Sequence, residues 1–150
     1  MLPEPTSRTA MFRRQAAALI VLAASSVHAA NIEWSEGELA LIAPYCIDTM
    51  GWKYGDSTNN PSPRAGHWVA RMGPSFWHMH HYCAGLLKLK RVKRAPSSLH
   101  DLQYRDVIGE FEYVIRSSTA DFVMLPELYA RIGEVHLLRN DIPRAAEAFE

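Results

Sequence analysis

Residues 126–150 constrain the fold more than any other stretch, because they have the pattern of a helical hairpin. Four apolar residues recur at the spacing that gives a helix one buried stripe, namely Leu128, Ile132, Val135 and Leu138. Pro126 suits the first helical turn, where its missing N–H costs nothing. Asn140 tolerates the left-handed conformation that ends a helix, and Asp141 can cap the next helix. We therefore expect two antiparallel helices joined by a tight turn.

The seam between these two helices is expected to be narrow. Gly133 and Ala145 have almost no side chain, so the helices can cross closely at these positions. Four larger side chains would fill the rest of the seam, those of Tyr129, Ile132, His136 and Phe149.

This arrangement resembles a tetratricopeptide repeat, a module of about 34 residues whose paired helices stack into a solenoid. With Pro126 as the first position, the repeat signature falls on Tyr129, Ile132, Gly133, His136, Ala145 and Phe149. His136 stands where the family usually has Tyr, and Asn140 replaces a common turn glycine. The resemblance implies an all-α fold of stacked antiparallel hairpins that holds other proteins together and seldom does chemistry. The alternative is an ordinary antiparallel helix pair, and residues 122–150 form this unit in either case.

A second, degenerate repeat is expected over residues 74–121. A helix over Pro74–Lys90 would pair with one over Tyr104–Ser117. The second of these helices has an apolar face made by Val107, Ile108, Phe111, Val114 and Ile115. Gly85 can take the place of the repeat glycine. Its separation from Val107 is 22 residues against 12 in the family, so about ten residues are inserted.

Residues 30–73 are expected to form a loop-rich N-terminal cap. Ser35 and Glu38 have the spacing of a capping box that begins a short helix, and Pro44 limits this helix. Glycine, proline and asparagine are frequent from Thr49 to Gly73, which favours an ordered loop with a short helix over His67–Met72. Three aromatic residues in this loop are too apolar for a free linker, namely Trp52, Tyr54 and Trp68.

Residues 1–29 have the pattern of a secretory signal peptide. Arg13 and Arg14 precede an apolar run of about ten residues, Ala16–Ala24, whereas spanning a bilayer takes roughly 20. Val27 and Ala29 suit the cleavage site, and no Cys directly follows that would carry a lipid anchor. We expect export to the periplasm or secretion, cleavage near Ala29 and at most peripheral membrane association. A buried core helix is the alternative.

Export determines how the only two cysteines, Cys46 and Cys83, are interpreted. An oxidising compartment favours a disulfide between them. The closed loop would span 38 residues, which corresponds to about 3–4 kcal/mol by the chain-entropy estimate.

The charge of the chain argues against nucleic acid as a partner. The formal net charge is zero, and it is near −2 without the segment 1–29, which has one acidic and three basic side chains. A nucleic-acid-binding domain needs a basic surface. The basic stretch Lys88–Arg94 can contact anionic lipid or polysaccharide, but a solvated helix end explains it more simply.

One cluster has side chains suited to metal ligation: His78, His80, His81 and Cys83. Residues three or four apart share a helix face, so His80 can converge with Cys83, and His78 with His81. These groups suit copper, zinc or haem iron. Helical spacing supplies two ligands at a time, whereas a tight site needs three or four, and a disulfide would remove the Cys83 sulfur. The favoured interpretation is structural, with His81 in a helix seam and His78 solvated.

The sequence thus predicts a non-catalytic scaffold that binds another protein, of unknown identity, in an envelope assembly. No Ser/His/Asp order, phosphate loop or paired-carboxylate motif stands out, and no cofactor is expected. The rival class is a periplasmic metal- or haem-binding helical protein that uses the His78–Cys83 cluster. The chain stops at Glu150 inside an amphipathic helix, so we expect it to be the N-terminal piece of a longer protein. A genuine end on a frayed helix is the alternative.

Overall fold

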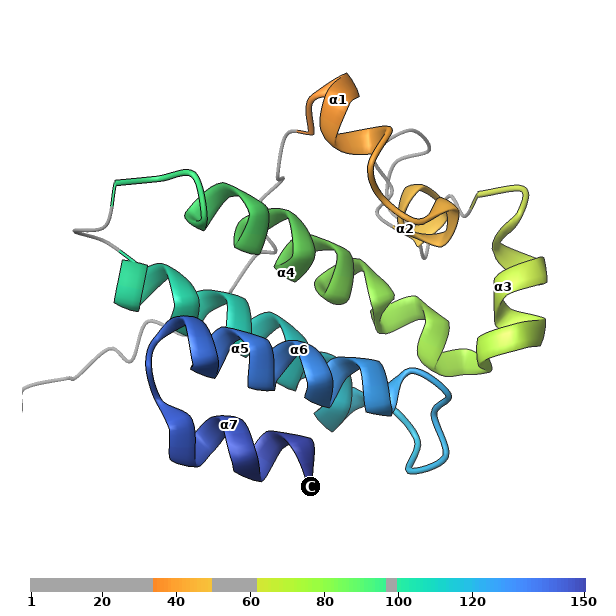
Figure 1. Cartoon of the computed structure of the whole chain (residues 1–150). Helices are drawn as coiled ribbons and strands as arrows, with labels where there is room; N and C mark the ends of the chain where they lie inside the picture. Colours follow the sequence, from red (N-terminus) through yellow and green to blue (C-terminus); the bar gives the residue numbers. More distant parts are fainter. Residues whose placement is uncertain (1–33, 50–61, 97–99) are drawn as a thin grey trace, which may run out of the picture. The chain divides into compact units, whose positions relative to one another are not determined.

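Every regular element is a helix in the residues that the computed structural model describes, 34–49, 62–96 and 100–150 (Figure 1). This confirms the all-α prediction for these ranges. The elements are α1 (Glu36–Leu39), α2 (Pro44–Thr49), α3 (Ala65–Met72), the 3-10 helix η1 (Pro74–His78), α4 (Met79–Val92), α5 (His100–Ser117), α6 (Leu125–Leu138) and α7 (Ile142–Phe149). The predicted signal peptide, together with Trp52 and Tyr54 of the predicted loop, lies outside the described residues.

Helices α6 and α7 form the hairpin that the sequence predicts. Pro126 lies in the first turn of α6. Asn140 has the positive φ of 58° that ends the helix, and the Asp141 carboxylate accepts a hydrogen bond of 3.4 Å from the Arg144 backbone N–H. Asn140 therefore ends α6 and Asp141 caps α7, as predicted from the sequence.

Helices α4 and α5 form a longer hairpin before it. The predicted helix over Pro74–Lys90 begins as the 3-10 turn η1 before it becomes α4. The partner helix begins at His100, four residues before the predicted Tyr104. Asp101 in its first turn favours this earlier start, because a negative charge is stabilising at a helix N-terminus.

The N-terminal segment differs from the single short helix that was predicted. Ser35 and Glu38 form the expected capping box, with a bond of 3.0 Å from the Ser35 N–H to the Glu38 carboxylate. Helix α1 already ends at Leu39, and Pro44 begins a second helix, α2, where its fixed φ is favourable. The predicted short helix over His67–Met72 is confirmed as α3, which begins two residues earlier.

The helices from α4 to α7 pack consecutively, each on the next, as Figure 1 shows. Between α4 and α6, Tyr82 donates a hydrogen bond of 3.0 Å to Glu127, and Lys93 lies 2.6 Å from Glu134. The largest fully buried side chains from these elements are Phe76, Phe111, Met79, Leu87, Leu128, Val107, Val114 and Val135. In the described ranges, no helix combines the length and apolar character needed to cross a membrane.

Each of the two hairpins contains the same kind of packing contact, in which a glycine on the first helix faces a phenylalanine ring on the second. A Cβ atom added to Gly85 would lie 2.5 Å from Cε1 of Phe111, and one added to Gly133 would lie 2.5 Å from Cε1 of Phe149. Each glycine therefore lets a ring approach the helix backbone closely. Gly85 and Phe111 are ten residues further apart in the sequence than Gly133 and Phe149. The extra residues lengthen α5 and the connection that precedes it.

Candidate functional site

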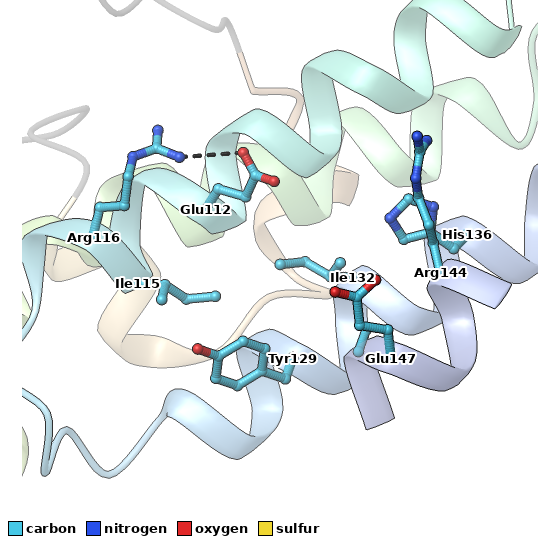
Figure 2. Close-up of a pocket in the computed structure, with 9 residues that line it drawn as sticks. Glu112, Ile115, Arg116, Tyr129, Ile132, His136, Arg144 and Glu147 are labelled. Carbon is cyan, nitrogen blue, oxygen red and sulfur yellow. Dashed lines mark hydrogen bonds and ion pairs between the residues drawn. The ribbon is translucent and has the colours of Figure 1, made fainter. Parts of the chain in front are cut away.

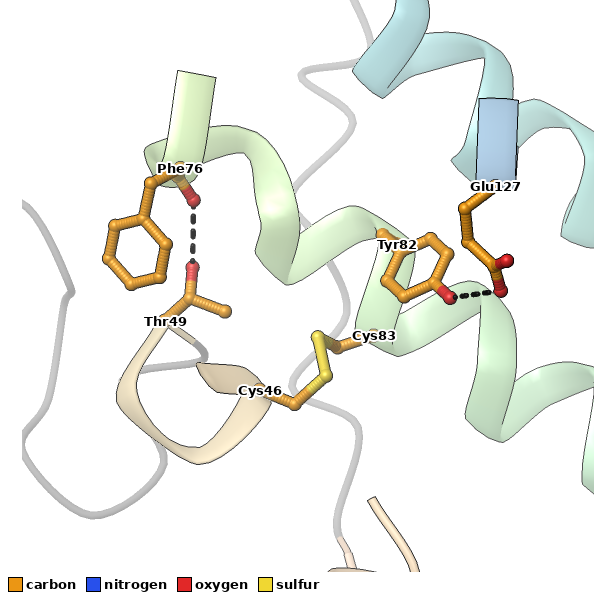
Figure 3. Close-up of a disulfide and its surroundings, with 6 residues drawn as sticks. All are labelled: Cys46, Thr49, Phe76, Tyr82, Cys83 and Glu127. Atoms are coloured by element: carbon orange, nitrogen blue, oxygen red, sulfur yellow. Dashed lines mark hydrogen bonds between the residues drawn. A yellow bond between two sulfur atoms is a disulfide. The ribbon is translucent and has the colours of Figure 1, made fainter. Parts of the chain in front are cut away.

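The two cysteines lie at disulfide distance, as the sequence analysis expected. Their sulfur atoms are 1.99 Å apart, and their Cα atoms are 5.6 Å apart (Figure 3). Both residues are fully buried, Cys46 on α2 and Cys83 on α4. Nearby, the Thr49 hydroxyl donates a hydrogen bond of 3.4 Å to the backbone carbonyl of Phe76. The disulfide therefore ties the N-terminal segment to the first hairpin.

The histidines of the predicted cluster are used in contacts within the protein. His81 Nδ1 lies 2.5 Å from a Glu110 carboxylate oxygen, and His80 Nδ1 lies 2.7 Å from the carbonyl oxygen of Trp77. The His78 ring makes an edge contact with Tyr113 at a centroid distance of 5.9 Å. Burial and the neighbouring His81 lower the pKa values of His78 and His80.

These contacts do not assemble the ligand set of the metal-binding alternative. Cys83 has no free sulfur, because it is bonded to Cys46. In the part of the chain that the structure describes, no group of three or more His, Cys, Asp or Glu side chains is placed to hold a metal ion.

Asp48 is a buried carboxylate beside the disulfide-bearing turn of α2. Its oxygens accept hydrogen bonds of 2.6 Å from Ser62, 3.1 and 3.2 Å from Arg64, and 2.6 Å from the Trp68 indole N–H. Burial alone would raise its pKa, but these donors outweigh burial and lower the pKa below its usual 3.8. The cluster holds α2 to the segment that leads into α3.

The fold should therefore lose stability in acid through Asp48. Because the folded-state pKa is lowered, the stabilisation is present above the unfolded pKa near 3.8 and is lost as the pH falls through the folded value. We expect Asp48→Asn to lower the free energy of unfolding by about 1–3 kcal/mol at pH 7, and to flatten its decrease below about pH 4. Urea unfolding at pH 7 and near pH 3.5 measures both effects. Asp121→Asn, at an exposed position, is the control, and equal losses from the two variants would contradict this role.

A groove lies between α5, α6 and α7, and we call it the α5–α7 groove (Figure 2). Its lining consists of Glu112, Ile115, Arg116, Tyr129, Ile132, His136, Arg144, Glu147 and Ala148. Apolar side chains such as Ile115 and Ile132 line its inner part, and Figure 2 shows the ion pair between Glu112 and Arg116 at its edge.

The second hairpin exposes several large apolar side chains, and two of them belong to the four residues predicted to fill its seam. Ile132 and His136 are buried as predicted. Tyr129 is 45% exposed and Phe149 is 55% exposed, and both line a further hollow at the end of the hairpin. Phe149 nevertheless lies in the seam, because a Cβ atom added to Gly133 would lie 2.5 Å from its ring. We define the second-hairpin surface by its exposed apolar residues, Tyr129, Leu137, Leu138, Ile142 and Phe149. Leu138 is therefore not part of the buried stripe in which it was predicted.

His136 is a buried polar group in the groove lining. The residue is only 7% exposed, and its Nδ1 atom has no hydrogen-bond partner. The nearest carboxylate oxygen, from Asp141, is 3.6 Å away. Burial lowers the pKa of His136, and the nearby Asp141 carboxylate acts in the opposite direction. A buried ring nitrogen without a hydrogen bond is an unsatisfied polar atom, and this one has essentially no exposed surface of its own.

Sequence reasoning identified His136, Tyr129 and Ile132 as repeat positions, but it did not find the groove around them. Arg144, Glu147 and Ala148 were treated only as members of a helix. Aligning Gly85 and Phe111 with Gly133 and Phe149 would have shown which of these residues face α6.

The chain matches no protein-family model, no curated protein and no solved structure. The interpretation of its site therefore comes from the geometry of its own residues.

Proposed function

We propose that this chain is an exported, non-catalytic scaffold that binds another protein through stacked helical hairpins of the tetratricopeptide type. The observation that carries the proposal is the second-hairpin surface. Two large aromatic residues, Tyr129 and Phe149, are about half exposed there and line one hollow. Clustered exposed apolar groups mark interaction sites, and aromatic residues are enriched in protein interfaces.

The shared glycine–phenylalanine contact supports the repeat interpretation. Gly85 with Phe111 and Gly133 with Phe149 place the helices of both hairpins at the same close approach. The contact of α5 with α6 joins one hairpin to the next. Stacked hairpins of this kind form surfaces whose outward residues can vary while the seams are kept.

The disulfide supports export to the periplasm or secretion, because disulfides persist in oxidising compartments. This agrees with the signal-peptide pattern of the segment 1–29. We infer a role in an envelope assembly, with membrane association at most peripheral.

The test is a pull-down from envelope extract, followed by binding measurements with the purified partner. We expect the unmodified chain to capture a partner that the double variant Tyr129→Ser, Phe149→Ser binds at least tenfold more weakly. Aromatic anchors in interfaces commonly contribute effects of this size. Circular dichroism checks that the variant is still helical.

The matched control removes two exposed apolar side chains elsewhere, by Leu102→Ser and Val123→Ser. We expect this control to bind the partner normally. The scaffold proposal would be wrong if none of the four substitutions changed the affinity for the partner, or if the chain alone turned over a small substrate.

A further inference from the structure

The hollow at the end of the second hairpin contains two aromatic rings and two carboxylates, and we call it the aromatic hollow. Its lining includes Leu125, Pro126, Tyr129, Glu147, Phe149 and Glu150. The hollow measures about 470 Å³, which lies within the usual range of ligand-binding pockets. Its rings come from both helices of the hairpin, since Tyr129 belongs to α6 and Phe149 to α7.

The two carboxylates of the aromatic hollow have no basic partner. Most acidic side chains in the part of the chain that the structure describes lie within ion-pair distance of a basic group, as Glu112 lies 3.2 Å from Arg116. Glu147 and Glu150 are exposed and make no ion pair with any described residue. The hollow therefore has two uncompensated negative charges beside its aromatic rings.

The adjoining α5–α7 groove does not neutralise these charges. Glu147 lines the groove as well as the aromatic hollow, so the two are continuous (Figure 2). The basic side chains of the groove lining already face other carboxylates of this chain, Arg116 and Arg144 at 3.2 Å and His136 at 3.6 Å. Among the described residues that line the hollow itself there is no Lys, Arg or His. The unpaired charge on this side of the hairpin is therefore negative.

We propose that the aromatic hollow binds an arginine side chain that a partner protein presents between apolar residues. This rests on the proposed scaffold function and names the chemistry of the segment bound. A guanidinium group stacks on aromatic rings and donates hydrogen bonds to carboxylates through its planar fork, so one arginine can use both features of the hollow. The apolar stem of the arginine and its apolar neighbours pack on Leu125 and Pro126.

Other occupants fit the aromatic hollow less well. An uncharged apolar segment would cover Glu147 and Glu150 without giving them a partner, and a carboxylate that loses water without a partner costs free energy. An acidic segment would add repulsion. A lysine is attracted by the same charges, but its strongly hydrated ammonium has no planar face to stack on Tyr129 or Phe149. We therefore expect the order of affinity arginine, lysine, uncharged and acidic.

The first test uses a short capped peptide in which one arginine, between two leucines, carries the only charge. Its twin has citrulline at that position, which keeps the shape of arginine and removes the charge. NMR of the full chain follows the ring signals of Tyr129 and Phe149 during each titration. We expect the arginine peptide to shift both rings and to bind about fivefold more tightly than the citrulline peptide. Equal affinities, or no shift at the two rings, would overturn the inference.

The second test removes the charges of the hollow by the double variant Glu147→Gln, Glu150→Gln. We expect it to bind the arginine peptide no more tightly than the citrulline peptide. The matched control, Glu36→Gln with Asp121→Asn, removes the same charge from two exposed carboxylates elsewhere and should keep the preference for arginine. Circular dichroism checks that both variants are helical. A preference that survives the first variant, or that both variants lose equally, would contradict an arginine site in the hollow.

The outcomes separate this inference from the proposed function. A partner from envelope extract that depends on Tyr129 and Phe149, but binds the Glu147→Gln, Glu150→Gln variant normally, would support the scaffold function and overturn the arginine site. A preference for the arginine peptide that needs both carboxylates would support the arginine site, even if no partner were captured and the scaffold function fell.

Discussion

Replacing both cysteines, by Cys46→Ala and Cys83→Ala, is expected to lower the free energy of unfolding by about 3–4 kcal/mol. The bond closes a loop with a sequence separation of 37, so its loss releases a large entropy in the unfolded chain. The effect is a large part of the stability of a small domain, which is commonly about 5–15 kcal/mol. Urea unfolding of the oxidised protein and of the variant measures it directly.

The stability lost with the disulfide should also differ from one part of the chain to another. The disulfide and the Asp48 cluster both hold α2, and among the described residues neither of them is bonded to α6 or α7. We expect hydrogen exchange to accelerate more in α2 and α3 than in the second hairpin. The unmodified protein, reduced in urea and refolded with its thiols blocked, is the control for the substitutions themselves. Unchanged midpoints in both cases would contradict a stabilising role for the bond.

Local signals predicted the second hairpin from sequence, because each depends on a few neighbouring residues. Pro126 and Asn140 act through their own backbone preferences, and Asp141 caps the helix that it precedes. The disulfide was predictable for a different reason. A chain with a single pair of cysteines and a signal-peptide pattern leaves one intramolecular pairing.

Residues that are compatible with two different local structures were harder to interpret from the sequence. Pro44 was expected to limit a helix, and it instead begins one, because proline is compatible with a first turn as well as with a helix end. The local sequence does not decide between these two roles. The burial of Cys46 and Asp48 two and four residues later shows what stabilises α2.

Long-range ion pairs could not be predicted, because the fold alone brings their partners together. The basic stretch Lys88–Arg94 has the appearance of a solvated helix end. In the structure, Lys88 pairs with Glu110, and Lys93 pairs with Glu134 on α6. The α5–α7 groove has the same origin, since its lining comes from three helices whose approach no local pattern specifies.

A larger side chain at Gly85 should destabilise the fold far more than the same change at Gly133. Gly85→Leu places carbon atoms against the ring of Phe111, which is fully buried and has no free space to enter. We expect a loss of about 3 kcal/mol, the upper end of the usual cost of overpacking. Gly133→Leu meets the ring of Phe149, which is half exposed and can rotate into water.

Gly85→Leu and Gly133→Leu differ mainly in how freely the facing phenylalanine ring can move. Both glycines lie inside helices, and both substitutions gain about 1 kcal/mol of helix propensity. For Gly133→Leu we therefore expect a net change within about 1 kcal/mol. Urea unfolding of the two variants gives the comparison. If Gly133→Leu were as costly as Gly85→Leu, Phe149 would have to be held as firmly as Phe111. The exposed aromatic that anchors the proposed partner surface would then be part of a rigid seam, unable to adjust to a ligand.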